Sequence, residues 1–283
     1  MENKKKILFI IDNLSTGGVN TSLSAVYARL KDDFNIRVFA LTHDGYKNHS
    51  FSEVLLPKNL LVDAFQCEIS RTSSFTEKLL KQCVKFLKRI SIMLKFDMRK
   101  ILFRSAAKAI ESADSYDRII AFQEGPSTHF SKYFGTNRKI AWVHSDYTRS
   151  FPKSNAEEYA TYDKLVFVSK YTLIQFNQKY PFIQQPLVTI HNYIDYDRIL
   201  ELSNDEIKDG SFSCSQYNII SMGRIVELKQ FRLIPAIARR LLDKGMLFKW
   251  FILGPICDQK EYETMMNNIK QYKCENTVIW LDK

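Results

Sequence analysis

Two cations follow a short apolar segment near residue 220, and together they could bind an anion. Residues 218–222 read Asn-Ile-Ile-Ser-Met, a pattern typical of a buried strand. Gly223 and Arg224 come directly after it, and Lys229 lies five residues beyond the arginine. Such a strand end suits a phosphate group, because backbone N–H groups and the dipole of a following helix, predicted here from Phe231, add to the side-chain charges. Solvated surface charges are the simpler interpretation of the same two residues.

His144 occupies a comparable place earlier in the chain. Residues 139–143 predict a strand, and open α/β sheets bind their ligands just beyond the carboxyl ends of the strands. A neutral imidazole has one nitrogen that donates a hydrogen bond and one that accepts, so it suits a sugar hydroxyl. A histidine that serves only the local structure is the alternative interpretation.

Gly17 and Gly18 follow the first apolar segment, residues 4–13, and precede a helical pattern. Glycines allow a backbone to approach a ligand closely, because no Cβ intervenes. The pair lacks the G-x-G-x-x-G spacing, so the sequence does not support a dinucleotide fingerprint. A tight turn explains the two glycines equally well.

Apolar segments alternate with helical patterns along the chain, which predicts an α/β protein with parallel sheets. The predicted strands are residues 4–13, 36–42, 118–122, 139–144, 164–168, 187–191, 219–222, 248–253 and 278–281. One predicted helix has apolar positions at Leu23, Val26, Tyr27 and Leu30. The other predicted helices are residues 128–134, 170–179, 231–244 and 259–273. Ser169 is the predicted N-cap of the helix 170–179. The polar, aperiodic segment 201–216 predicts a linker between a domain of residues 1–200 and a second one of residues 217–283.

The net charge of +10 is concentrated in one segment. Residues 71–108 contain eleven Lys and Arg against two acidic residues, and within residues 76–112 apolar side chains recur at helical spacing. A basic amphipathic helix that packs on the sheet and solvates its lysines is one interpretation. Contact with an anionic membrane surface is a second. No recognition motif accompanies the charge, so we expect no nucleic-acid partner.

The run Gly223-Arg224-x4-Lys229 resembles the G-R-L-x-x-x-K-G signature of GT-B glycosyltransferases, specifically the retaining enzymes of family four (glycosyl transferases group 1). The resemblance implies two Rossmann-like, doubly wound domains that face a cleft. It also implies that Arg224 and Lys229 hold the diphosphate of a nucleotide-sugar donor and that His144 hydrogen-bonds the transferred sugar. Gln230 stands where the family has glycine.

Two further segments resemble the same family. The Gly17-Gly18 loop is similar to the family loop that faces the donor phosphates and the acceptor. Asn192 begins the segment Asn-Tyr-Ile-Asp, which is similar to the family's N-G-V-D before the interdomain linker, with Tyr193 in place of glycine. The family's second domain also carries two glutamates with seven residues between them, which contact the sugar and the ribose and which this sequence lacks, so we expect the second domain to be only partly present.

The implied activity is retaining transfer of a sugar from a nucleotide-diphosphate donor to a lipid-linked or cell-surface polysaccharide acceptor. We expect no cofactor and no metal, since the two cations can stabilise the leaving diphosphate. The alternative is a non-catalytic or truncated GT-B relative that binds a partner or a membrane. A Rossmann-type epimerase is a weaker alternative, because the sequence lacks a G-x-x-G-x-x-G loop.

Composition sets the expected compartment. The five cysteines are scattered and odd in number, which favours neither a disulfide framework nor a zinc site. The apolar part of residues 1–11 is too short for a signal-peptide core, and no run of apolar residues is long enough to span a bilayer. We therefore expect a cytoplasmic protein, with peripheral contact to the inner face of the cell membrane as the alternative.

Overall fold

The computed structural model describes residues 4–15, 17–42, 51–55, 98–136, 138–206 and 217–281. The chain forms two compact units, Met1–Tyr196 and Asp197–Lys283, and each is described by itself. Both are built on a parallel sheet, as the alternation of apolar segments and helical patterns predicts.

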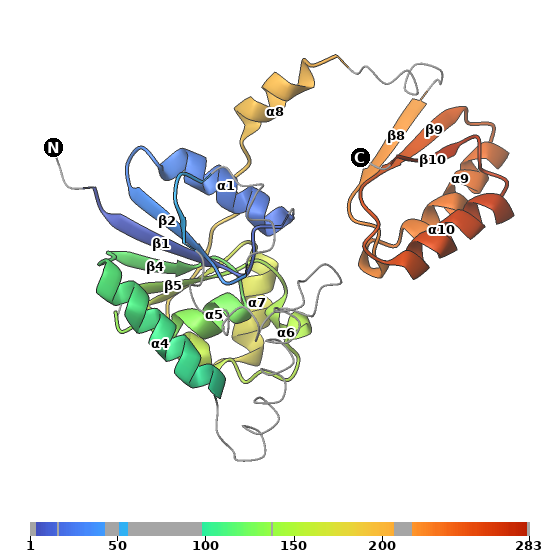
Figure 1. Cartoon of the computed structure of the whole chain (residues 1–283). Coiled ribbons are helices and arrows are strands. Elements are labelled where there is room, and N and C mark those ends of the chain that lie inside the picture. The colour runs from blue at the N-terminus through green and yellow to red at the C-terminus, as the bar shows by residue number, and fades with distance from the viewer. Residues whose placement is uncertain are drawn as a thin grey trace, which may run out of the picture. The chain divides into compact units, whose positions relative to one another are not determined.

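The first unit is built on a seven-stranded parallel sheet in the order β3-β2-β1-β4-β5-β6-β7 (Figure 1). Its strands are β1 (Lys6–Ile11), β2 (Asn35–Ala40), β3 (Val54–Leu55), β4 (Arg118–Ala121), β5 (Lys139–Val143), β6 (Lys164–Phe167) and β7 (Leu187–Thr189). Since all pairs are parallel, the carboxyl ends of the strands meet at one edge of the sheet, where ligands bind in open α/β folds.

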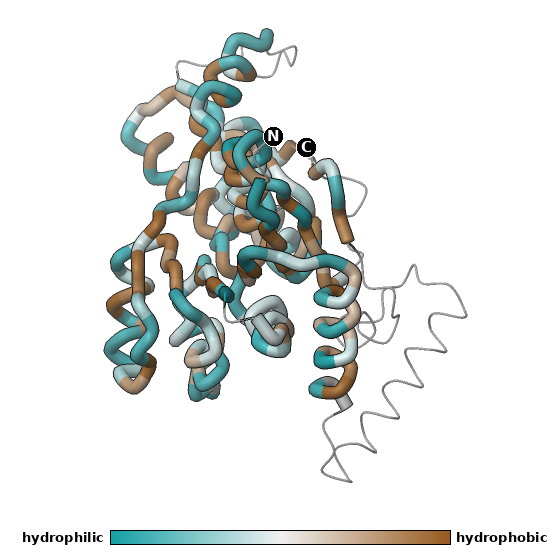
Figure 2. Tube along the Cα trace, turned by 90° about the vertical axis from the view of Figure 1, so that its left-hand side faces the viewer, coloured by the Kyte–Doolittle hydropathy of each residue, from teal (hydrophilic) through white to brown (hydrophobic). Residues whose placement is uncertain are grey.

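Helices cover both faces of this sheet (Figure 1). They are α1 (Gly18–Leu30), α4 (Met98–Ala113), α5 (Pro126–Ser131), α6 (Tyr147–Ser150), α7 (Lys170–Lys179) and the 3-10 turn η2 (Glu157–Thr161). Along the helices hydrophobic and hydrophilic stretches alternate, as expected of helices with one buried side (Figure 2). Ser169 caps α7, because its side chain accepts a hydrogen bond from the N–H of Thr172, and this confirms the predicted cap.

Strand β1 explains why the layers form. Its alternate residues Ile7, Phe9 and Ile11 pack in the cluster that contains α1, while Leu8 and Ile10 pack on the other face against α4 and α5. All five are at most 7% exposed. The continuous apolar run is therefore explained by burial on both faces, as predicted for a parallel strand.

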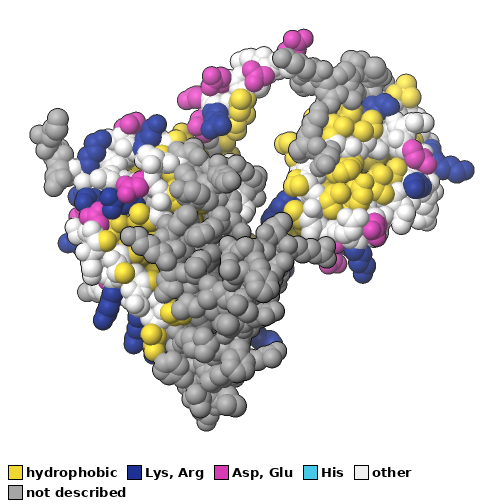
Figure 3. All heavy atoms as spheres, in the orientation of Figure 1, with side chains coloured by type: hydrophobic (Ala, Val, Ile, Leu, Met, Phe, Trp, Pro, Cys, Tyr) yellow, Lys and Arg dark blue, Asp and Glu magenta, His cyan; other side chains and the backbone are white. Residues whose placement is uncertain are grey.

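The second unit is a three-stranded parallel sheet in the order β10-β9-β8, with helices on one face (Figure 1). Its elements are α8 (Tyr196–Ser203), which spans the division between the units, β8 (Tyr217–Met222), the 3-10 turns η4 (Glu227–Lys229) and η5 (Phe231–Leu233), α9 (Ile234–Asp243), β9 (Phe248–Leu253), α10 (Gln259–Gln271) and β10 (Val278–Leu281). Phe248, Ile252 and Val278 pack against α9 and α10. Hydrophobic side chains also gather on the surface of this unit (Figure 3), where Ile220 is 50% and Met222 75% exposed.

The predicted strands and helices differ from the observed ones at several of their ends, and three differences concern helices. The helix predicted from Phe231 begins at Ile234, because Gln230 adopts a left-handed conformation and η5 intervenes. The helix predicted for residues 128–134 is shifted and ends at Ser131. The first three residues of the predicted linker, 201–203, belong to α8.

The basic segment is described only from residue 98 onward, and residues 71–97 lie outside the described residues. In α4, Phe103 and Ala107 are fully buried against the sheet, while Lys100, Arg104 and Lys108 are exposed. The first interpretation of the segment, packing on the sheet with solvated cations, therefore holds for α4. Within the described ranges no helix combines the length and the apolar character that crossing a membrane requires.

Candidate functional site

His144 lies at the carboxyl edge of the first sheet, directly after β5, as predicted. Its imidazole contacts Phe122 with ring centroids 4.8 Å apart, and it stacks on Trp142 at 6.3 Å and an interplanar angle of 22°. The Nε2 atom is buried and has no hydrogen-bond partner among the described residues. The ring is therefore held by aromatic contacts and by no hydrogen bond to the described residues.

Burial determines the charge of His144. Desolvation lowers the pKa of the imidazole to about 4, and the nearby Glu124 carboxylate only partly opposes this shift. The side chain is accordingly neutral at pH 7 and presents one donor and one acceptor. This form suits a hydrogen bond to a sugar hydroxyl and does not suit binding of a phosphate by charge.

Two acidic residues at the same edge were missed by the sequence analysis. Glu124, three residues beyond β4, is 8% exposed and accepts a hydrogen bond from the backbone N–H of His144 at 2.7 Å. Asp12, directly after β1, accepts hydrogen bonds from the N–H and the hydroxyl of Ser127 in α5. The available signal for Glu124 was its position two residues after the predicted strand 118–122, whereas Asp12 lay within the predicted strand 4–13 and gave no such signal.

The Gly17-Gly18 loop leads into α1 without any strained backbone. Gly17 is extended, with φ 176°, and a Cβ added at Gly18 would meet nothing within 4 Å. No conformation there requires glycine, so the open space beside the loop is the feature that agrees with the predicted ligand contact. On α1 the hydroxyl of Ser22 donates to the side-chain oxygen of Asn192 at 3.0 Å, which joins the predicted turn residue to this helix.

In the second unit, Gly223 and Gly254 end neighbouring strands and their backbones touch. Gly223 has φ +150° and Gly254 has φ +140°, conformations that L side chains rarely adopt. A Cβ on Gly254 would lie 2.1 Å from the carbonyl oxygen of Gly223, so only glycine fits there. The N–H of Gly223 donates to the carbonyl of Leu253 at 2.9 Å, and this bond continues the ladder between β8 and β9.

Arg224 and Lys229 follow this glycine contact, and both side chains are exposed. Neither makes an ion pair or a hydrogen bond from its side chain to another described residue. The Lys229 side chain lies near Gly223, where an added Cβ would be 3.6 Å from its Cε. Arg224 and Lys229 thus remain available to an anion as far as the described residues show, and their joint role in binding one stays a prediction.

The backbone contributes less to this group than predicted. The N–H of Ile225 donates to Pro255 at 2.9 Å and that of Lys229 to Val226 at 3.0 Å, so these amides, like that of Gly223, are already hydrogen-bonded. The α-helix begins at Ile234, five residues beyond Lys229. The side-chain charges are therefore the main source of a positive field here.

Gln230 occupies the position where the resembling family has glycine. It adopts φ 53° and ψ 34°, the left-handed region that costs a residue with a Cβ about 1–2 kcal/mol. The turn geometry is thus compatible with glutamine, and the conformation gives the physical reason for glycine in the motif.

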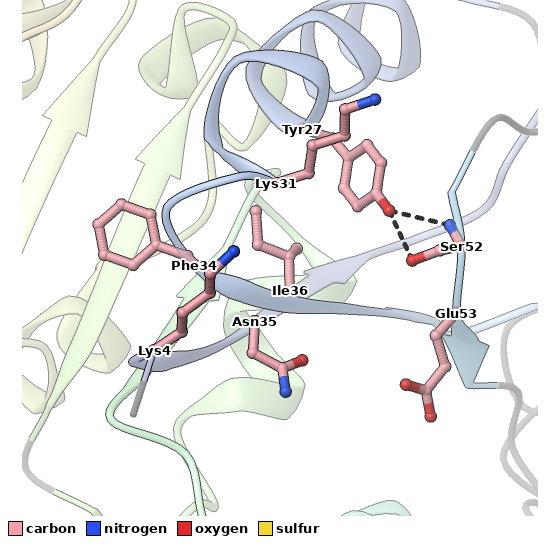
Figure 4. Close-up of a pocket in the computed structure, with 8 residues that line it drawn as sticks. All are labelled: Lys4, Tyr27, Lys31, Phe34, Asn35, Ile36, Ser52 and Glu53. Atoms are coloured by element: carbon pink, nitrogen blue, oxygen red, sulfur yellow. Dashed lines mark hydrogen bonds between the residues drawn. The ribbon is translucent and has the colours of Figure 1, made fainter. Parts of the chain in front are cut away.

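A groove of about 320 Å³ lies at the opposite, amino-terminal edge of the first sheet, between α1 and the starts of β1 and β2 (Figure 4). It contains Tyr27 and Lys31, which have the Tyr-x-x-x-Lys spacing of Rossmann-type epimerases. The Tyr27 hydroxyl is directed at Ser52, to which it donates at 2.6 Å (Figure 4). This pair lies away from the ligand-binding edge and lacks the glycine loop, so it does not support that epimerase interpretation.

One possible metal motif also occurs in the sequence. Asp195 and Asp197 have Asp-x-Asp spacing and lie at the start of α8. Across the ranges that the structure describes, no three His, Cys, Asp or Glu side chains gather in a way that could hold a metal ion.

Comparison with known proteins identifies the fold. No protein-family model matches the sequence, and a search of curated proteins finds no match. Among solved structures, a glycosyltransferase from Rickettsia africae is similar with a TM-score of 0.62 and 14% identity, over 99% of this chain and 68% of that one. HepE of Anabaena, solved in complex with UDP-glucose, is similar with a TM-score of 0.58 and 15% identity, over 98% of this chain and 68% of that one.

The likeness extends to a protein with a different activity. UDP-N-acetylglucosamine 2-epimerase from Rickettsia bellii matches with a TM-score of 0.55 and 8% identity, over 99% of this chain and 69% of that one. At these identities the likeness concerns the fold, and activity must be argued from the site. The chain has the mixed α/β fold of the GT-B glycosyltransferases, with a large parallel sheet followed by a second, smaller one.

Proposed function

We propose that this protein is a glycosyltransferase that uses a nucleotide-diphosphate sugar as donor. The single observation that carries the proposal is that Arg224 and Lys229, which follow the Gly223–Gly254 contact, are both exposed and have no side-chain partner among the described residues. The fold likeness supports the same choice, because HepE was solved with UDP-glucose bound. UDP is accordingly the first nucleotide to test.

In this proposal the two cations act on the departing group. As the bond between sugar and diphosphate breaks, negative charge accumulates on the diphosphate, and nearby cations lower the energy of that state. Neutral His144 hydrogen-bonds a hydroxyl of the transferred sugar, and the open space beside Gly17 and Gly18 receives donor or acceptor. We also propose that the transfer retains the configuration at the anomeric carbon and that the protein is a family-four enzyme.

The acceptor is proposed to be a lipid-linked or cell-surface glycan, reached from the cytoplasmic side. The supporting feature is the outward face of α4, with Lys100, Arg104 and Lys108 exposed at spacings of four residues. Its apolar side is buried in the sheet, so attraction to a membrane would be electrostatic. Sedimentation with vesicles that contain anionic lipid, compared with neutral vesicles, tests this part.

The donor proposal is tested by a screen of nucleotide sugars for thermal stabilisation, followed by a transfer assay with the best donor. We expect a UDP-sugar to raise the melting temperature, because a ligand that binds only the folded state stabilises it. Formation of a glycoside with the donor's anomeric configuration would support transfer with retention. Conversion of the donor to its epimer, or no stabilisation by any nucleotide sugar, would contradict the proposal.

A further inference from the structure

Glu124 is a buried acidic residue that neither the sequence motifs nor the proposed donor contacts explain. It lies three residues beyond β4, at the carboxyl edge of the first sheet, and is only 8% exposed. Burial of a carboxylate is unfavourable unless hydrogen bonds compensate for lost water. Its place beside His144 offers a reason for this burial.

The carboxylate joins two strands where their own pairing has ended. The register between β4 and β5 runs as far as Ala121 and Ala141. Beyond that pair, Glu124 Oε2 accepts the N–H of His144 at 2.7 Å, so a side chain replaces the missing backbone bond. This contact fixes the backbone from which the imidazole projects.

Nothing else described in the structure holds the imidazole by a directed bond. Nε2 has no partner among the described residues, and the ring has only its contacts with Phe122 and Trp142. A hydrogen bond would restrict the direction of a ring nitrogen, because it weakens steeply when the angle departs from linear. The orientation of the ring therefore depends on the backbone at residue 144.

We propose that Glu124 is a positioning residue for His144, which it holds in place for a hydrogen bond to the transferred sugar. This inference rests on the proposed function of His144, and Glu124 itself need not touch the substrate. The carboxylate fixes the end of β5, and the aromatic neighbours restrict the ring.

The first test measures hydrogen exchange of the His144 amide by NMR and needs no activity. Glu124→Ala removes the acceptor, and Glu124→Asp keeps the charge but is one methylene too short. We expect both to raise the exchange rate at least about tenfold, whereas Glu124→Gln retains an acceptor oxygen and stays close to wild type. Glu158→Gln is the control, since Glu158 is a half-buried glutamate of the same unit that contacts His129 and Tyr147 instead of His144.

The second test is a double-mutant cycle on the transfer reaction. We expect Glu124→Ala to lower kcat about 10- to 100-fold with little change in donor KM, because a small misplacement of a contact group slows reaction strongly. In a His144→Gln background the same change should have no further effect, and Glu124→Gln should restore most of kcat.

The outcomes distinguish the positioning role of Glu124 from the proposed sugar contact of His144. Unchanged exchange of the His144 amide in Glu124→Ala and Glu124→Asp would overturn the positioning role. Multiplying effects of the Glu124 and His144 changes would overturn it as well, since a residue that only supports the fold acts in both backgrounds. Full activity of His144→Gln would instead contradict the proposed sugar contact, while the exchange result would still decide the role of Glu124.

Discussion

The two units present opposite chemistry at the same structural position, the carboxyl edge of a parallel sheet. In the first unit, His144 is neutral, its imidazole packs against Phe122 and Trp142, and its backbone N–H donates to a buried carboxylate. In the second, Arg224 and Lys229 are exposed and unpaired within the described residues, beside two glycines whose backbones touch. The comparison shows that the same kind of sheet edge carries a neutral, largely buried imidazole in one unit and exposed cations in the other.

The largest predicted effect concerns the glycine contact of the second unit. Gly254→Ala places a Cβ 2.1 Å from the Gly223 carbonyl at φ +140°, so we expect the unit to lose about 4 kcal/mol of stability. Gly245→Ala is the control within the unit, because its φ is +80° but an added Cβ meets nothing within 4 Å, and it should lose about 1 kcal/mol. Hydrogen exchange in β8 and β9 measures both.

The first unit provides the contrast to that prediction. Gly18→Ala should leave the stability of the unit within about 0.5 kcal/mol of wild type, since the site is open and lies at the start of a helix. Equal losses of stability in Gly18→Ala and Gly254→Ala would contradict the inferred difference, which is that the backbone is closely packed at Gly254 and open at Gly18.

The next effect concerns the burial of neutral His144. Its pKa is about 4 in the folded state and about 6.5 when exposed, so the unfolded state binds more protons between these values. Stability contributed by neutral His144 is therefore present above about pH 6.5 and is lost as the pH falls towards 4, by about 3 kcal/mol. Urea unfolding at several pH values should show this loss in wild type relative to His144→Gln.

The contradicting result is equally specific. If the difference in unfolding free energy between wild type and His144→Gln did not change across this pH range, the imidazole would not be buried as a neutral group. The first sheet would then not carry a neutral group at its carboxyl edge, and the contrast with the cationic edge of the second unit would be wrong.

The smallest predicted effect concerns Gln230. Its left-handed backbone is unfavourable for a residue with a Cβ, so Gln230→Gly should stabilise the second unit by about 0.5–1 kcal/mol. Gln230→Ala keeps the Cβ and should change little. A destabilised Gln230→Gly variant, measured by urea unfolding, would show that the glutamine side chain supports the turn by contacts of its own.

Sequence patterns predicted most of the helices and strands. A strand that is buried on both faces, such as β1, requires a continuous run of apolar residues, which is easily seen in the sequence. The patterns correctly placed His144 directly after β5, and Gly223 and Arg224 directly after β8. They could not predict the hydrogen-bonded state of the amides near Gly223, since this depends on a partner strand that begins 25 residues later.

Glu124 was missed for a related reason. Its contact joins residues 20 positions apart, and a lone glutamate after a strand carries no periodicity. The turns η4 and η5 were also missed, because the left-handed conformation of Gln230 is set by the surrounding turn and not by a preference of glutamine.

The most direct test of the central claim, that Arg224 and Lys229 bind the diphosphate of a nucleotide sugar, is calorimetric titration of UDP-glucose. Each charge-assisted contact contributes about 1.5–3 kcal/mol, so Arg224→Ala/Lys229→Ala should raise the Kd at least about 100-fold. Arg240→Ala, at another exposed cation of the same unit, should leave it unchanged. Binding by the double variant as tight as by wild type would contradict the account.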